Sequence, residues 1–163
     1  MKTHSKFFIL IALAAGLALG WGGCGKAQRP SEAGAHKHEH HPPHGGTPVV
    51  LGDEAYHLEL VRDAEAGTLS AYVLDGEMEE FIRAGSPAFE VAAKVGGTEQ
   101  TLVFKPVANA ATGETVTDTA LYEASAPWLK TTGGFDAVIK SVAVRGTVFE
   151  NVAFNFPKGN DKD

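Results

Sequence analysis

The stretch that decides the fold is residues 47–76, TPVVLGDEAYHLELVRDAEAGTLSAYVLDG. Apolar and polar residues alternate through it, and glycines interrupt the alternation at short intervals. A period of two residues is typical of β-strands that turn one face to a core. The stretch therefore predicts three successive strands, over Pro48–Leu51, Tyr56–Arg62 and Thr68–Leu74, with turns at the intervening glycines.

The same pattern continues to the end of the chain. Further strands are predicted over Glu80–Arg83 (a weak edge strand), Ala88–Val95, Glu99–Val107, Ala120–Ala124, Ala137–Val144 and Thr147–Phe156. Gly96-Gly97 and Arg145-Gly146 each join two of these runs and indicate hairpins. In the last run the apolar residues change parity near Glu150 and Asn151, which predicts a bulge there.

No long helix is predicted, and only Pro127 and the residues after it favour a single helical turn. About eight strands, with turns every ~8–12 residues, favour an all-β fold. The architecture we expect is an antiparallel, Ig-like β-sandwich. A small β-barrel is the alternative.

The first two dozen residues have the layout of an export signal. Lys2 and Lys6 precede an unbroken apolar run, Phe7–Leu19, which has the length of a signal-peptide core and is too short for an ordinary membrane span. Two glycines and Cys24 follow, and this order resembles a bacterial lipoprotein signal, in which the cysteine becomes the lipidated first residue. Trp21 stands where such signals usually carry an aliphatic residue. The alternative is a plain secretory signal that leaves Cys24 as a free thiol.

These features divide the chain into four expected parts. Residues 1–23 are a signal peptide, 24–46 a His-rich flexible tether, 47–157 the β domain and 158–163 a disordered tail. The tether is expected to be flexible because its Gly, Ala, Pro, Ser, Glu and His residues offer almost nothing to bury. We expect a cell-envelope protein that faces the periplasm and is anchored by lipid to the inner or outer membrane.

Five of the seven histidines crowd into residues 36–44, HKHEHHPPH. In an extended chain His36, His38 and His40 point to one side, and His41 and His44 follow. Imidazole is a common ligand of Zn(II), Cu(II) and Ni(II), and much of it is neutral at pH 7. The segment therefore predicts binding of a divalent transition metal and no organic cofactor. The alternative is a solvated linker in which histidine is one polar residue among several.

His57 and Glu59 share one face of a predicted strand, opposite Leu58 and Leu60. A lone histidine at such a position commonly faces solvent without a ligand role. If His44 folds back beside it, however, His44, His57 and Glu59 supply two nitrogens and one oxygen to a metal ion.

The His-Gly-Gly at 44–46, the turn at Gly52 and the strands Tyr56–Val61 and Tyr72–Asp75 together resemble a periplasmic segment of heavy-metal efflux adaptor (membrane fusion) proteins of the CzcB type. They are also similar to small exported lipoproteins that carry this module. The resemblance implies a β module for divalent-metal handling, with His44, His57 and Glu59 at recurring positions and efflux-system envelope proteins as partners. The chain is too short to hold an adaptor's long helical hairpin, so an active role in transport is not implied.

Composition narrows the function classes. The net charge is −6 and Lys and Arg do not cluster, which argues against nucleic-acid binding. The acidic run Glu77, Glu79 and Glu80 is typical of a solvated face, and no nucleophile elbow, phosphate loop or metalloprotease helix motif occurs. An enzyme is therefore not predicted. Two hypotheses follow: a metal-binding envelope lipoprotein in metal homeostasis or efflux, or an envelope interaction module without a specific metal.

Overall fold

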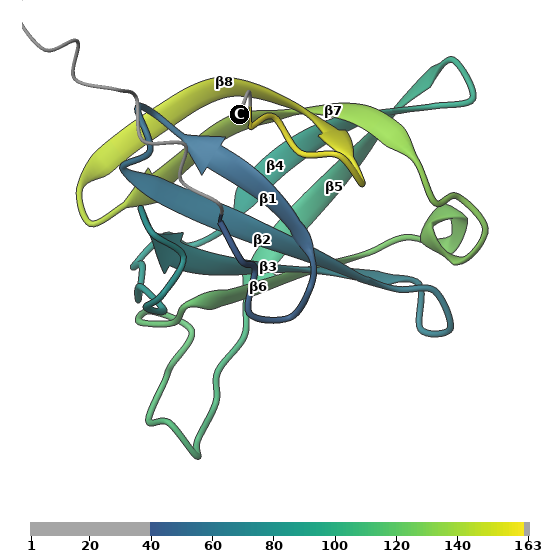
Figure 1. Cartoon of the computed structure of the whole chain (residues 1–163). Coiled ribbons are helices and arrows are strands. Elements are labelled where there is room, and N and C mark those ends of the chain that lie inside the picture. The colour runs from purple at the N-terminus through teal and green to yellow at the C-terminus, as the bar shows by residue number, and fades with distance from the viewer. Residues whose placement is uncertain (1–39, 162–163) are drawn as a thin grey trace, which may run out of the picture. The chain divides into compact units, whose positions relative to one another are not determined.

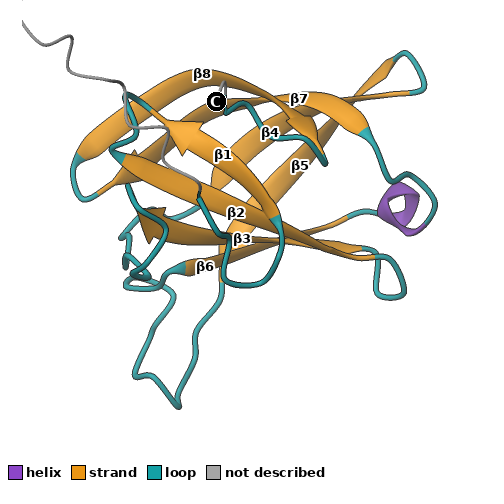
Figure 2. Cartoon of the chain, viewed as in Figure 1, coloured by secondary structure: helices purple, strands orange, loops and turns teal. Residues whose placement is uncertain are grey.

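The computed structural model of the protein describes residues 40–161. Eight strands and one short 3-10 helix make up this part (Figure 2). They are β1 (Thr47–Leu51), β2 (Tyr56–Asp63), β3 (Thr68–Asp75), β4 (Phe89–Val95), β5 (Thr98–Pro106), β6 (Leu121–Ser125), η1 (Pro127–Lys130), β7 (Phe135–Val144) and β8 (Thr147–Phe156). Within residues 40–161, no helix has the length and apolar character needed to cross a membrane. The predicted all-β fold of about eight strands is confirmed.

The strands form a single antiparallel sheet in the order β1-β2-β3-β6-β5-β4-β7-β8. The sheet coils until its two ends, β1 and β8, come near each other, so that it resembles a nearly closed barrel (Figure 1). Of the two expected architectures, the small barrel fits. The β5–β6 junction is the weakest link, because only Lys105 and Pro106 of β5 pair with β6.

The core lies inside the coiled sheet. Leu58 and Leu60 of β2 point into it, as the alternation predicts. Phe89 stacks on Phe104 with ring centroids 4.8 Å apart, and Phe135 stacks on Phe156 at 5.2 Å. Aromatic rings in such pairs contribute large buried apolar areas, so these stacks hold β4 to β5 and β7 to β8.

The buried residues of β8 change parity at Glu150 and Asn151, as predicted. The bulge predicted there is not found, because β8 pairs with β7 in one continuous register. Glu150 and Asn151 are both exposed, and Asn151 has a φ of 54°. The β7–β8 register nevertheless runs through without a shift. The shift falls on the other side of β7, where Lys140 is the extra residue against β4, next to Glu90. Both strands change face together, which bends the sheet towards closure.

The weak strand expected over Glu80–Arg83 does not form as a strand. Phe81 makes an isolated bridge to Leu74, while Ala84 bridges Thr119 instead. Because neighbouring residues turn to different partners, no continuous ladder develops. The segment lies beside the end of β3, where the Asp75 N–H donates to the Glu80 carbonyl and the Ile82 N–H donates to the Val73 carbonyl.

Two segments that lie outside the expected 47–157 domain, apart from Pro157 at its end, pack on the sheet. We call residues 40–46 the strap and residues 157–161 the tail. Strap residues contact β2, and tail residues contact β1 and β8. These contacts bring both ends of the described chain to β1 and β2.

Candidate metal centre

The outer face of β2 is buried, contrary to the expectation that His57 faces solvent. His57 and Glu59 are both 0 % exposed although neither belongs to the core inside the sheet. The strap lies along this face, where the backbone N–H groups of His44 and Gly46 donate to the Glu59 carboxylate. The alternation places the two side chains outside correctly, but it does not reveal that another segment covers them.

Two glycines let the strap approach β2 so closely. Gly45 has a φ of +66°, a conformation that suits glycine, and its N–H donates to the Pro42 carbonyl at 2.9 Å. At Gly46 an added Cβ would lie 2.7 Å from the Leu60 carbonyl oxygen and 2.8 Å from the Glu59 Cγ. The His-Gly-Gly motif therefore has a physical reason: the turn at Gly45 favours glycine, and the close contact at Gly46 leaves no room for a Cβ.

Glu59 binds the strap through three hydrogen bonds. Its Oε1 accepts from the backbone N–H of His44 at 2.7 Å and from that of Gly46 at 2.9 Å, and its Oε2 accepts from Nδ1 of His44 at 2.8 Å. A carboxylate that accepts from the Nδ1–H of an imidazole fixes its tautomer and directs Nε2 away. In this arrangement Glu59 orients His44.

His44 therefore folds back onto β2, as we considered, but it meets Glu59. Its ring stacks on Tyr72 at a centroid distance of 4.0 Å, and its side chain is 38 % exposed. The ring that lies against His57 is instead that of His40, with centroids 4.5 Å apart and planes 58° apart.

The His40–His57 pair has an unusual hydrogen-bonding state. Nδ1 of His57 donates to the Asp75 carbonyl at 3.3 Å, and its Nε2 is buried with no hydrogen-bond partner. Nδ1 of His40 donates to Oδ2 of Asp161 at 3.2 Å, and the His40 side chain is only 4 % exposed. Because an oxygen acceptor occupies Nδ1 of each ring, the lone pair of each neutral ring lies on Nε2.

Burial favours the neutral form of the His57 imidazole. Burial lowers the pKa of the His57 imidazole below 6.5, and the neighbouring His40 lowers it further, while the Asp75 carbonyl opposes the shift. A neutral imidazole is the form that binds a metal ion. A buried nitrogen without a partner costs roughly 1–3 kcal/mol, which a bound ion would offset.

The predicted ligands fall into three groups. His40 and His57 come together, His44 and Glu59 come together, and His41 is exposed. His36, His38 and the predicted lipidation site Cys24 lie outside the described residues. Within the described part, no set of three or more His, Cys, Asp or Glu side chains is arranged to hold a metal ion.

Asp161 is a site residue that the sequence did not reveal. It lies in the stretch expected to be a disordered tail, and no motif marks it. A turn signal does precede it, since Pro157, Gly159 and Asn160 are residues that favour turns. The pairing of Asp161 with a histidine 121 positions earlier follows only from the fold.

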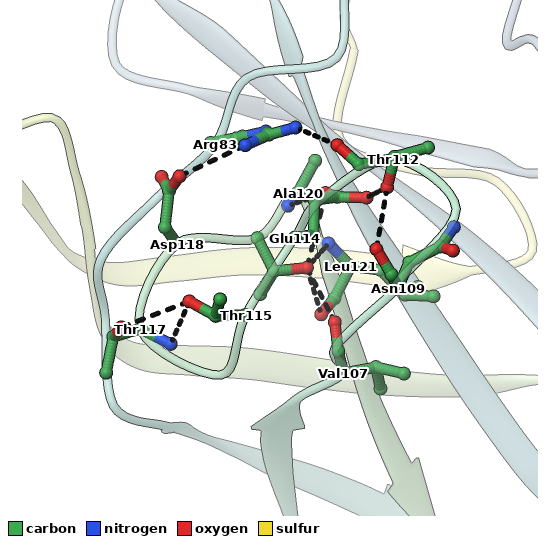
Figure 3. Close-up of polar contacts among 11 residues, drawn as sticks. Arg83, Val107, Asn109, Thr112, Glu114, Thr115, Thr117, Asp118, Ala120 and Leu121 are labelled. Carbon is green, nitrogen blue, oxygen red and sulfur yellow. Dashed lines mark hydrogen bonds and ion pairs between the residues drawn. The ribbon is translucent and has the colours of Figure 1, made fainter.

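A second feature lies beside His44. Tyr72, Phe81 and Arg83 line a cavity of about 370 Å³ together with the loop between β5 and β6. Internal hydrogen bonds hold that loop: Glu114 accepts from the backbone N–H of Ala120 at 2.8 Å (Figure 3). Arg83 contacts the same loop by donating to Asp118 at 3.2 Å.

Comparison with known proteins does not assign the chain to a family: no family model, curated protein or solved structure matches it.

Proposed function

We propose that this protein is a lipid-anchored envelope protein that binds a divalent transition metal ion in metal homeostasis or efflux. His40 and His57 are the central ligands. His38 and His36, two and four residues before His40, are the candidates for completing the coordination. Cys24 carries the lipid, and envelope components of an efflux system are the partners that fit this role.

One observation supports metal binding above the others: the buried, unpartnered Nε2 of His57 beside the ring of His40. Natural interiors seldom leave a polar nitrogen without a partner, and each case calls for an explanation. A metal ion is a suitable partner because both rings have their Nδ1 atoms bonded to oxygen acceptors, as metal-binding histidines usually do.

The donor chemistry selects the class of ion. Two neutral imidazole nitrogens suit Zn(II), Cu(II) or Ni(II). Imidazole nitrogen, unlike thiolate or thioether sulfur, does not select Cu(I), so the pair favours these divalent ions.

Calorimetric titration of the full chain with Zn(II), Cu(II) and Ni(II) tests the metal proposal. We expect binding clearly tighter than millimolar, and we expect His40→Leu and His57→Leu each to weaken it by about tenfold or more. His41→Leu is the matched control because His41 is an exposed neighbour in the same segment. Equal affinity in all three variants and the wild type would exclude this pair as the site.

The anchor has a separate test. Mass spectrometry of the mature chain is expected to find Cys24 as the N-terminal residue with an attached lipid. Cys24→Ser is expected to release the protein from membranes. A mature chain that begins elsewhere and has a free Cys24 thiol would exclude lipidation while leaving the metal proposal intact.

The alternative function, an envelope interaction module, is favoured by the cavity beside His44. Phe81, at its rim, is 48 % exposed, and large exposed apolar side chains at a cavity favour binding of another molecule. Capture of a partner from envelope extracts by the two variants separates the proposals. A partner that binds Phe81→Ser but not His40→Leu supports the metal proposal. The opposite pattern favours the interaction module.

A further inference from the structure

The tail meets the histidine pair and the free edge of β1 at one place. Asp161 accepts a hydrogen bond from His40 at 3.2 Å. One residue earlier, the side chain of Asn160 accepts from the Val50 N–H at 2.7 Å and donates to the Val50 carbonyl at 3.2 Å. Val50 is the residue of β1 that pairs with His57 across the β1–β2 ladder. Adjacent residues of the tail therefore contact one ligand and the strand that supports the other.

The same tail connects the two ends of the sheet. Gly159 exchanges two backbone hydrogen bonds with Asn155 of β8, at 2.7 and 3.0 Å. Thr47 of β1 donates through its hydroxyl to the Pro157 carbonyl at 3.1 Å. The Asn160 amide supplies β1 with the donor and the acceptor that a neighbouring strand would otherwise provide. The tail is thus the link that closes the seam between β1 and β8 (Figure 1).

We propose that Asp161 is a positioning residue of the metal centre, and that metal binding fixes the tail across β1, so that occupancy of the centre and closure of the β1–β8 seam are coupled. This inference rests on the proposed function, because it requires an ion bound between His40 and His57. It adds a regulatory role that the histidines alone do not imply.

The coupling has a direct physical basis. A metal ion on Nε2 of His40 polarises the ring and strengthens the donation from Nδ1 to the Asp161 carboxylate. That bond restrains the tail, and the restrained tail keeps Asn160 on Val50. Linkage is reciprocal: if the ion stabilises the docked tail, the docked tail raises the affinity for the ion by the same factor.

Hydrogen exchange of the full chain, with and without Zn(II), measures the coupling. We expect Zn(II) to slow amide exchange at Val50 and in residues 158–161. Asp161→Ala is expected to lower Zn(II) affinity about tenfold or more and to remove that protection. Glu65→Ala is the matched control, because it removes a carboxylate from the exposed β2–β3 turn and is expected to leave both quantities unchanged.

Asn160→Ala separates coupling from local orientation. Asn160 hydrogen-bonds to Val50 and not to either histidine ring in the pair. If the seam and the centre are coupled, its removal lowers Zn(II) affinity by about fivefold or more. If Asp161 only orients His40, the Asn160→Ala chain binds Zn(II) like the wild type, and the coupling is refuted.

The failure of this inference is distinguishable from failure of the proposed function. A wild-type chain that binds no Zn(II) overturns both. Binding that is lost in His40→Leu and His57→Leu, with the same Val50 exchange in the presence and absence of Zn(II), overturns the coupling alone.

Discussion

Replacing His57 with leucine separates a ligand from a merely packed core histidine. Leucine has a volume close to that of histidine and no polar atoms, so it fills the site on β2 without a nitrogen. We expect His57→Leu to be at least as stable as the wild type without metal, and to lose the stabilisation that metal confers. A histidine that is needed for packing and hydrogen bonding would behave in the opposite way.

The magnitude follows from the two ring nitrogens. Removing the buried, unpartnered Nε2 gains about 1–3 kcal/mol. Losing the 3.3 Å bond from Nδ1 to the Asp75 carbonyl costs about 0.5–1.5 kcal/mol. That carbonyl keeps a partner, because the Met78 N–H also donates to it at 3.3 Å. The net expectation is a gain of about 1 kcal/mol, which raises Tm by roughly 3–5 °C.

Zn(II) should reverse the order of the two proteins. At a free ion concentration one hundred times Kd, a ligand that binds only the folded state stabilises it by about 2.7 kcal/mol, and Tm rises by roughly 10 °C. Zn(II) should stabilise the wild type by this amount and should stabilise His57→Leu only slightly. Thermal unfolding followed by circular dichroism, in chelator and then in Zn(II), measures both effects. The reasoning is refuted if His57→Leu loses more than about 1 kcal/mol in chelator and is still stabilised by Zn(II) as strongly as the wild type.

Three further predictions concern the supporting structure. Gly46→Ala should lower the free energy of unfolding, measured by urea titration, by about 1–3 kcal/mol, because its Cβ would lie 2.7–2.8 Å from three atoms of β2. Gly133→Ala is the control and should lower it less, because the nearest atom to its Cβ would be 3.7 Å away. Thr119→Val should lower the free energy of unfolding by about 1–2 kcal/mol, because the buried Thr119 hydroxyl donates to the Val107 carbonyl at 2.7 Å. Thr117 is exposed, so Thr117→Val should leave the free energy of unfolding nearly unchanged in the same urea titration. Burial raises the pKa of Tyr122 above its usual value of 10.0, so the folded state holds the proton longer than the unfolded state does. The contribution of the Tyr122 hydroxyl to the free energy of unfolding should be intact below about pH 10 and should decline above it. Urea titrations of the wild type and Tyr122→Phe measure this contribution, and a difference between them that stays constant above about pH 10 would contradict the prediction.

Local patterns were sufficient to predict most strands and hairpins. Alternation in 56–62 and 68–74 located β2 and β3 to within a residue, because each strand has one face on the core. Gly96-Gly97 and Arg145-Gly146 form the two predicted hairpins, and all four residues have positive φ. The pattern does not decide between a sandwich and a barrel, because closure depends on pairings between distant strands, such as β3 with β6.

The candidate site was only partly predictable for the same reason. The side of β2 that carries His57 and Glu59 follows from period two, but their burial follows from the strap, whose composition favours flexibility. The sequence also does not show that His40, and not His44, meets His57. That choice depends on the length of the turn at Pro42–Gly45 and on Glu59, which holds His44 two residues further along β2.

The most direct test of metal binding at the His40–His57 pair is nitrogen NMR of the histidine rings during a Zn(II) titration. We predict that the Nε2 signals of His57 and His40 move together and saturate with one ion, while both Nδ1 atoms keep their protons. If Zn(II) binds and the Nε2 signal of His57 stays where it is in the metal-free protein, the central claim is contradicted.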